Sequence, residues 1–273
     1  MRLTSILRPA AVAGAILSGA LSAQAQTWSG FYLGGQVGGA SLPSGDGSFV
    51  RFDTGLDGGF GDTVFTAAGG DAFSPGFCPG TAQGVVPAAG CAREDDGLDL
   101  GGRLGYDWQS GGLVFGLVGE VSTPDLTDSL TAFSTTPASY TFTRELKALG
   151  SLGMRAGYGG RRLLVYGTGS LAYGDVDRTF TTSNRVNTFV PTDDGGAWGW
   201  RAGGGAELRV DRLSLGAEYV FTRLDDAARY TVRSQGPAPV TNPFIRANPA
   251  GTDLQRSDDL ELHTLRFTAS YRF

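Results

Sequence analysis

Eight segments of this chain alternate apolar side chains with polar side chains or glycine, with a period of two residues. Successive side chains of a β-strand point to opposite faces, so each segment predicts a strand with one apolar and one polar face. In the second segment, for example, Leu98, Leu100 and Leu104 share one face, and Asp99 and Arg103 share the other. The segments are Phe31–Ala40, Gly97–Gln109, Leu113–Val121, Glu145–Tyr158, Leu163–Gly174, Ala197–Val210, Leu213–Leu224 and Leu262–Phe273.

The connections between these segments alternate strictly between long and short. A strand of about ten residues is long enough to cross an outer membrane at a tilt. Barrels of that membrane have short turns on the periplasmic side and long loops outside the cell. The pattern therefore predicts antiparallel strands, with both termini of the mature chain in the periplasm. The long connections are 41–96, 122–144, 175–196 and 225–261, and the short ones are 110–112, 159–162 and 211–212.

Aromatic side chains gather at both ends of the predicted strands, as they do where a bilayer meets water. Because an unpaired backbone group in hydrocarbon costs several kcal/mol, the sheet must also close on itself. We therefore predict an all-β fold, an eight-stranded antiparallel transmembrane β-barrel with long extracellular loops and short periplasmic turns. The predicted periplasmic rim is Phe31, Tyr106, Trp108, Tyr158, Tyr271 and Phe273, and the outer rim is Tyr173, Trp198, Trp200, Tyr219 and Phe221.

The first 25 residues have the composition of a secretory signal peptide. Arg2 and Arg8 give a basic start, residues 10–21 are apolar, and Ala23 and Ala25 give a small-x-small cleavage site. We expect residues 1–25 to be cleaved and residues 26–273 to form the barrel in the outer membrane of a Gram-negative bacterium. A net charge of −5 argues against a nucleic-acid partner, which would require clustered lysine and arginine.

Charged side chains on the polar faces point into the predicted barrel. An eight-stranded barrel is just wide enough inside for side chains to fill it. We interpret these charges as an ion-paired plug, and the alternative is the lining of a narrow ion path. The set is Arg103, Glu120, Lys147, Arg155, Arg201, Glu207, Glu218 and Arg266.

Cys78 and Cys91, the two cysteines of the chain, lie close together in the first long connection. An exported protein meets an oxidising compartment, so we predict a disulfide between them. Metal binding or redox chemistry would instead favour CxxC spacing or nearby histidines, which this chain lacks.

Several stretches together resemble the small porin-like outer-membrane proteins of alphaproteobacteria, within the OmpA-like and opacity-type eight-stranded barrel superfamily. The resemblance covers all eight strands, and it implies that Phe273 is a signal to the barrel-assembly machinery. Because the chain ends there, we expect no peptidoglycan-binding domain. The stretches are WSGFYLGGQVGGA at 28–40, GLVGEV at 116–121, GSLGMRAGY at 150–158, LLVYGTGSLAYG at 163–174, GAEYVF at 216–221 and LRFTASYRF at 265–273.

The sequence predicts no catalytic site, cofactor or metal. A lipid-modifying esterase would need a serine and an acid beside its histidine, but His263 stands alone, with Leu265 two residues on. Asp53, Asp57 and Asp62 could hold Ca²⁺, although acids spaced along an exposed loop are usually only solvated.

We therefore expect a structural and surface-interaction role, in envelope integrity, adhesion or host contact, with a low-conductance porin as the alternative. The expected partners are outer-membrane lipid, lipopolysaccharide and, through loops 41–96 and 225–261, an extracellular protein. Binding usually resides on loops carried by a rigid scaffold. Six phenylalanines in the first loop indicate either a packed mini-fold or a docking patch. They are Phe49, Phe52, Phe60, Phe65, Phe73 and Phe77.

Overall fold

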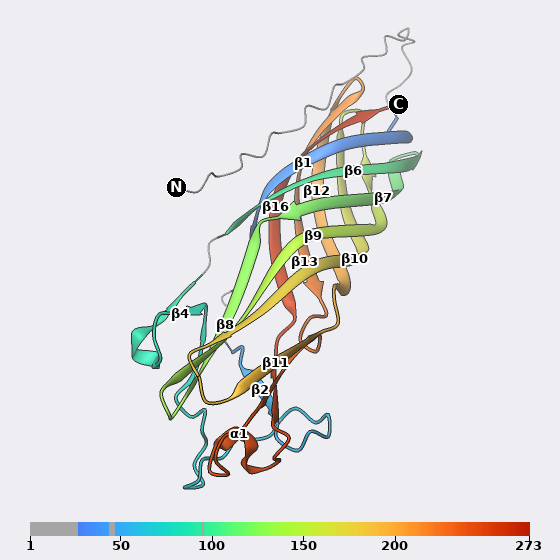
Figure 1. Cartoon of the computed structure of the whole chain (residues 1–273). Helices are drawn as coiled ribbons and strands as arrows, with labels where there is room; N and C mark the ends of the chain where they lie inside the picture. Colours follow the sequence, from blue (N-terminus) through green and yellow to red (C-terminus); the bar gives the residue numbers. More distant parts are fainter. Residues whose placement is uncertain (1–26, 44–46, 94–95) are drawn as a thin grey trace, which may run out of the picture.

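The computed structural model describes residues 27–43, 47–93 and 96–273 (Figure 1). The predicted signal peptide, residues 1–25, lies outside the described residues. Within the described part of the chain, no helix has the length and apolar character needed to cross a membrane.

Eight strands form a closed antiparallel barrel (Figure 1). The barrel closes where the first strand pairs with the last, with Tyr32 opposite Arg272 and Gly38 opposite Arg266. The predicted fold and all eight predicted segments are confirmed, and two of the segments match their strands residue for residue. The strands are β1 (Gly30–Ser41), β6 (Gly97–Ser110), β7 (Leu113–Pro124), β9 (Ala138–Gly159), β10 (Leu163–Thr182), β12 (Ala197–Val210), β13 (Leu213–Leu224) and β16 (Leu260–Arg272).

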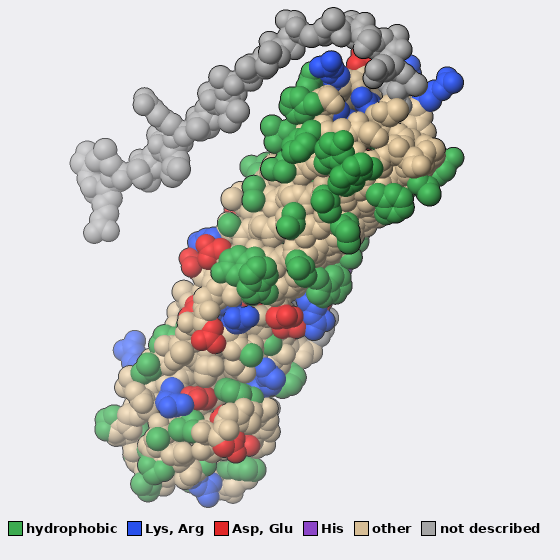
Figure 2. Space-filling view, turned by 90° about the vertical axis from the view of Figure 1, so that its right-hand side faces the viewer, with side chains coloured by type: hydrophobic (Ala, Val, Ile, Leu, Met, Phe, Trp, Pro, Cys, Tyr) green, Lys and Arg blue, Asp and Glu red, His purple; other side chains and the backbone are tan. Residues whose placement is uncertain are grey.

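The outer face of the barrel is apolar, as the alternation predicts. Leu33, Leu104 and Phe267 each expose more than half of their surface. At the periplasmic rim, Phe31 packs edge-on against Tyr106 with ring centroids 6.0 Å apart. Figure 2 shows green apolar side chains over the barrel, and red and blue charged side chains gathering beyond them. This distribution matches a hydrocarbon belt that ends at a polar interface.

Two strands of the barrel continue past its outer end, where the long connections fold into a second unit that we call the cap (residues 47–93, 126–144, 177–194 and 226–258). Within it, β8 pairs with the start of β9, and β3 pairs with β8. A separate four-stranded sheet has the order β11-β14-β15-β2. The cap elements are β2 (Val50–Asp53), β3 (Gly76–Pro79), β4 (Thr81–Ala82), η1 (Pro87–Ala89), β5 (Cys91–Ala92), β8 (Leu126–Ser134), β11 (Thr188–Asp193), β14 (Tyr230–Gln235), α1 (Pro243–Arg246) and β15 (Thr252–Arg256).

The cap has a hydrophobic core of its own. Phe52 and Phe73 are buried in it with ring centroids 4.4 Å apart, whereas Phe49, Phe65 and Phe77 remain exposed. Burying one phenylalanine side chain stabilises a fold by about 1.5–3 kcal/mol. The first loop is therefore part of a packed mini-fold. Its buried members are Val50, Phe52, Val64, Ala72, Phe73, Leu130, Ala132, Ala138, Tyr140, Phe142, Tyr230, Val232, Phe244 and Leu254.

The predicted disulfide is present. Cys78 in β3 is bonded to Cys91 in β5, across a hairpin that the two short strands β4 and β5 close. The bond holds this hairpin to the rest of the cap, because β3 also pairs with β8.

A closed ladder of backbone hydrogen bonds has no edge from which detergent can begin to unravel it. We therefore expect the folded protein to resist SDS at room temperature and to unfold on boiling. Electrophoresis of heated and unheated samples should show two different mobilities. A single mobility under both conditions would contradict the closed barrel.

Candidate functional site

Charged residues fill the middle of the barrel, in what we call the central layer. Arg266 donates hydrogen bonds to Glu120 at 2.7 Å and to Glu218 at 3.0 Å. Arg103 pairs with the same two carboxylates, each at 3.2 Å, and Arg201 reaches Glu120 at 3.2 Å. All five side chains are buried. Buried charges are tolerated only when they are paired and hydrogen-bonded, as they are here.

A second ionic group, the periplasmic layer, lies nearer the short turns. Arg155 donates to Asp107 at 2.8 Å and to Glu207 at 2.6 Å. Arg272 reaches the same two acids at 2.7 and 3.2 Å. The guanidinium groups also lie over the ring of Tyr32, at 4.5 Å for Arg155 and 4.9 Å for Arg272, which adds cation–π attraction.

Trp28 closes the periplasmic end of the lumen. It is fully buried, its indole N–H donates to the carbonyl of Gly160 at 2.9 Å, and the guanidinium of Arg272 lies 4.7 Å from its ring. It packs with Val114 and Leu164. The indole N–H of Trp28 therefore has a hydrogen-bond acceptor, and its ring is packed inside the barrel.

An apolar layer closes the outer end of the lumen. Its residues come from the inward faces of the barrel strands and from β8, which begins just beyond the rim. Side chains of this kind exclude water and offer an ion no ligand. From the periplasmic end outward, the lumen thus contains Trp28 and its neighbours, the periplasmic layer, the central layer and this apolar layer. The apolar layer consists of Ala40, Leu126, Leu146, Leu149, Ala172, Val176, Ala197, Leu224, Leu260 and Leu262, with Leu42 packed against it.

The structure places seven of the eight predicted interior charges in the lumen, and the expectation for Lys147 is wrong. Between β9 and β10, Asp175 pairs with Ala148 but Val176 pairs with Leu146, so Lys147 is the extra residue of a β-bulge. A bulge reverses which residues of a strand face inward. Lys147 consequently lies on the outside, where it is exposed and paired with Glu145.

The predicted interior set omitted several residues that lie in the lumen, among them Asp107, Arg272 and Trp28. Asp107 and Arg272 occupy the polar faces of their segments, so the alternation contained the signal for both. Trp28 precedes the first alternating segment and gave no such signal. Glycine makes the room that these charges need, because a Cβ atom on Gly116 would lie 2.1 Å from the Asp107 carboxylate.

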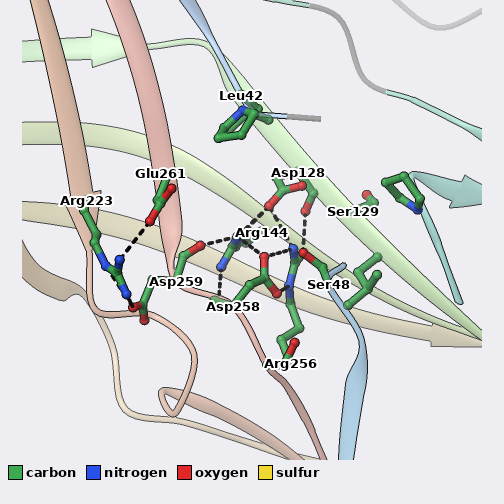
Figure 3. A pocket seen from close by; sticks show the side chains of 14 residues that line it. Leu42, Ser48, Asp128, Ser129, Arg144, Arg223, Arg256, Asp258, Asp259 and Glu261 are labelled. Atoms are coloured by element: carbon green, nitrogen blue, oxygen red, sulfur yellow. Dashed lines mark hydrogen bonds and ion pairs between the residues drawn. The ribbon is translucent and has the colours of Figure 1, made fainter. Parts of the chain in front are cut away.

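Beyond the apolar layer, a third ion-paired group joins the cap to the barrel. We call Arg144, Arg178, Arg256, Asp128, Asp226 and Asp258 the neck cluster. Figure 3 shows Arg144 and Arg256 converging on Asp128 and Asp258 beside a cavity of about 300 Å³. Arg144 reaches Asp226 at 3.0 Å, and Arg178 reaches the other oxygen of that carboxylate at 3.0 Å.

The neck cluster shifts the titration of its acids. Burial alone would raise the pKa of Asp258, but the nearby Arg144 and Arg256 outweigh burial and hold that pKa below its ordinary value. The carboxylate is therefore ionised at neutral pH and contributes to attaching the cap.

The aspartates of the first loop that were considered as Ca²⁺ ligands accept hydrogen bonds from the loop itself. Asp53 accepts the backbone N–H of Gly58 at 2.7 Å, and Asp62 accepts both the N–H and the hydroxyl of Thr54 at 2.8 Å. These two hydrogen bonds lower the pKa of Asp62. In the described ranges, no group of three or more histidine, cysteine, aspartate or glutamate side chains is arranged to hold a metal ion.

His263 belongs to the outer aromatic rim. Its Nδ1 lies 2.6 Å from the Tyr219 hydroxyl, and its ring is 5.2 Å from that of Phe221. This placement gives the imidazole a hydrogen bond at the interface.

Replacing a buried carboxylate of the central layer should destabilise the barrel strongly. Glu218→Gln leaves Arg103 and Arg266 without one of their counter-charges, and breaking a buried pair from one side costs about 3–5 kcal/mol. Urea titration, with the folded fraction read from SDS mobility, should show a clear fall in the midpoint. Glu145→Gln, the matched change at an exposed ion pair, should leave the midpoint nearly unchanged. Equal midpoints for the two variants would contradict the ion-paired layer.

Acid should loosen the cap. A carboxyl group with a lowered folded pKa stabilises the fold above its ordinary pKa, 3.8 for Asp258, and that contribution is lost as pH falls through the lower folded value. The protection of the β15 amides against hydrogen exchange, after correction for the intrinsic effect of pH, should therefore stay constant from neutral pH to about 5. It should fall at lower pH. Asp258→Asn should be less protected at neutral pH and should show a weaker pH dependence. The same dependence in both proteins would contradict this assignment.

Comparisons with known proteins agree with this architecture. A family model described as the outer membrane protein β-barrel domain matches residues 10–273. The 31 kDa outer-membrane immunogenic proteins of Brucella melitensis biotype 1 and Brucella suis biovar 1 are each 28% identical over 176 residues. That match covers 63% of this chain and 65% of theirs, so it spans less than two thirds of their length.

The solved structure of the outer membrane protein OprG from Pseudomonas aeruginosa aligns with 90% of this chain and 97% of its own, at 13% identity and a TM-score of 0.49. The match of the family model spans all eight strands of the barrel. This chain belongs to the family of outer-membrane proteins that share the outer membrane protein β-barrel domain, and it resides in the outer membrane.

Proposed function

We propose that this protein is a closed outer-membrane anchor whose cap contacts partner molecules outside the cell, a structural and surface-interaction role. The observation that carries the proposal is the filled lumen beneath a folded cap. An ion crossing the barrel would have to break paired charges in two layers and then pass a layer lined by leucine and alanine. Moving a bare ion into such surroundings costs several kcal/mol.

The cap holds the extracellular loops in a fixed arrangement, as a binding surface requires. The cap is continuous with the barrel, because β9 and β10 belong to both units. The neck cluster then pins the loops to these strands. Loops held on a rigid scaffold are the usual place for binding. The name of the Brucella relatives, immunogenic proteins, supports exposure of such a surface to host molecules.

Two further contacts belong to this proposal. The apolar outer face and its aromatic rims would contact outer-membrane lipid and lipopolysaccharide. Phe273, whose side chain is 71% exposed and whose N–H donates to the carbonyl of Phe31 at 2.9 Å, would present the C-terminal strand to the barrel-assembly machinery.

A low-conductance porin is the second candidate, and one observation favours it. Between the central and apolar layers, the side chains of Gln36, Asp99 and Ser122 are buried, and among the described residues they have polar atoms without a hydrogen-bond partner. Buried polar groups of this kind normally bind water. A short hydrated stretch inside the barrel would be the starting point of an ion path.

Planar-bilayer recording tests the proposal. We expect no steady openings for the purified protein. The double variant Leu224→Ser and Leu262→Ser, which makes the apolar layer polar, should also stay closed, because the two ionic layers still fill the lumen. If the apolar layer were instead the gate of a porin, this variant would conduct more than the wild type. Steady channels in the wild-type protein would overturn the closed anchor and favour the porin.

A further inference from the structure

The end of the cap farthest from the barrel, where α1 lies, holds a cavity of about 220 Å³ that we call the tip pocket (Figure 1). Four parts of the chain surround it: residues 72–73, the turn between β8 and β9, residues 183–186, and the start of α1. Pockets for whole small molecules usually measure about 300–1,000 Å³. The tip pocket is smaller, and its size suits one side chain of a partner.

The floor of the tip pocket is apolar and rigid. Phe73, Tyr140 and Phe244 are each at least 97% buried. Their ring centroids lie 5.3 Å apart for Phe73 and Tyr140, 5.6 Å for Tyr140 and Phe244, and 5.8 Å for Phe73 and Phe244. Three rings in mutual contact leave one another little freedom to move, so the floor keeps its shape without a ligand.

One wall of the pocket is a ladder of side-chain amides. Asn184 donates to the Tyr140 hydroxyl at 3.0 Å and to Asn187 at 3.2 Å. Asn242 donates to Asn187 at 3.0 Å and accepts the backbone N–H of Phe244 at 3.0 Å. The ladder ties the segment after β10 to the segment before α1. A pocket that is already ordered loses less entropy when it binds.

The rim of the pocket carries an unpaired positive charge. Arg185 and Val186 are exposed there. Arg185 makes no ion pair within the ranges that the structure describes, whereas Arg178, Arg233 and Arg256 of the cap each contact a carboxylate within 3.0 Å. The tip therefore offers an apolar socket with a free guanidinium beside it.

We propose that the tip pocket binds an exposed segment of a partner protein, in which one apolar side chain enters the pocket and a neighbouring carboxylate pairs with Arg185. This inference rests on the proposed surface-interaction role and names the chemistry of the partner. A neutral sugar fits less well, because it carries neither a charge to pair with Arg185 nor an apolar side chain to fill the pocket. The free guanidinium selects an acidic segment over a neutral or basic one.

The test uses two small probes and the full chain folded in detergent. N-acetyl-phenylalanine carries both an apolar ring and a carboxylate, and its amide carries only the ring. Dissociation constants from ligand-observed NMR should show that the acid binds about fivefold tighter than the amide, the effect of one exposed ion pair. The amide also controls for partition of the ring into micelles.

Three variants locate the binding. Arg185→Gln should abolish the preference for the acid and leave binding of the amide unchanged. Thr136→Leu, at an exposed position of the lining, should fill the pocket and weaken both probes. Arg162→Gln, which removes the same charge from an exposed periplasmic turn, should change nothing.

Equal binding of both probes to the wild type, no binding at all, or a preference for the acid that survives Arg185→Gln would overturn the proposal. Binding of N-acetylglucosamine that Thr136→Leu abolishes, without binding of the acid, would assign the pocket to glycans instead. The bilayer recording reports on the lumen and this titration reports on the cap, so the closed anchor and the tip pocket can fail separately.

Discussion

Every backbone N–H and C=O in hydrocarbon must have a partner, and the pairing of β1 with β16 is what satisfies the last edge of this sheet. The rest of the structure depends on that closure. Eight strands close into a barrel too narrow to hold a channel of bulk water, so its inward side chains must pack against one another. Because the outward face is committed to lipid, polar and charged residues can lie only inside, and they must neutralise each other there.

The interior meets this demand by alternating ionic and apolar layers along the axis of the molecule. The periplasmic and central layers pair arginines with carboxylates, the leucine-rich layer excludes water, the neck cluster pairs charges again, and the core of the cap is apolar once more. The periplasmic layer lies against Trp28 and its neighbours, and the neck cluster lies between the leucine-rich layer and the core of the cap, so apolar surroundings strengthen the electrostatic attraction within both groups. The same stacking makes barrel and cap one continuous body, so the shape of the tip is fixed by contacts that reach down to the membrane.

The sequence alone was enough to predict the barrel, because the alternation of apolar and polar side chains can be recognised in each strand without knowledge of its neighbours. It located β12 and β13 to the residue, and seven of the eight charges that it placed inside the barrel lie there. Lys147 escaped prediction because a bulge is a property of two strands, two residues opposing one, and a single strand does not reveal it. The cap escaped because its short strands come from four connections, and the tip pocket depends on Asn184, Asn187 and Asn242, which only the fold brings together.

The bulge at Lys147 also explains how β9 can place side chains both in the barrel lumen and in the interior of the cap. On the barrel side of it, the inward residues of β9 are odd-numbered and include Leu149 and Arg155. On the cap side they are even-numbered, so Phe142 reaches the cap core and Arg144 reaches the neck cluster. Without the extra residue, one regular alternation would have to suit both interiors. A single inserted residue thus separates the pattern that the membrane imposes on the barrel from the pattern that the cap requires.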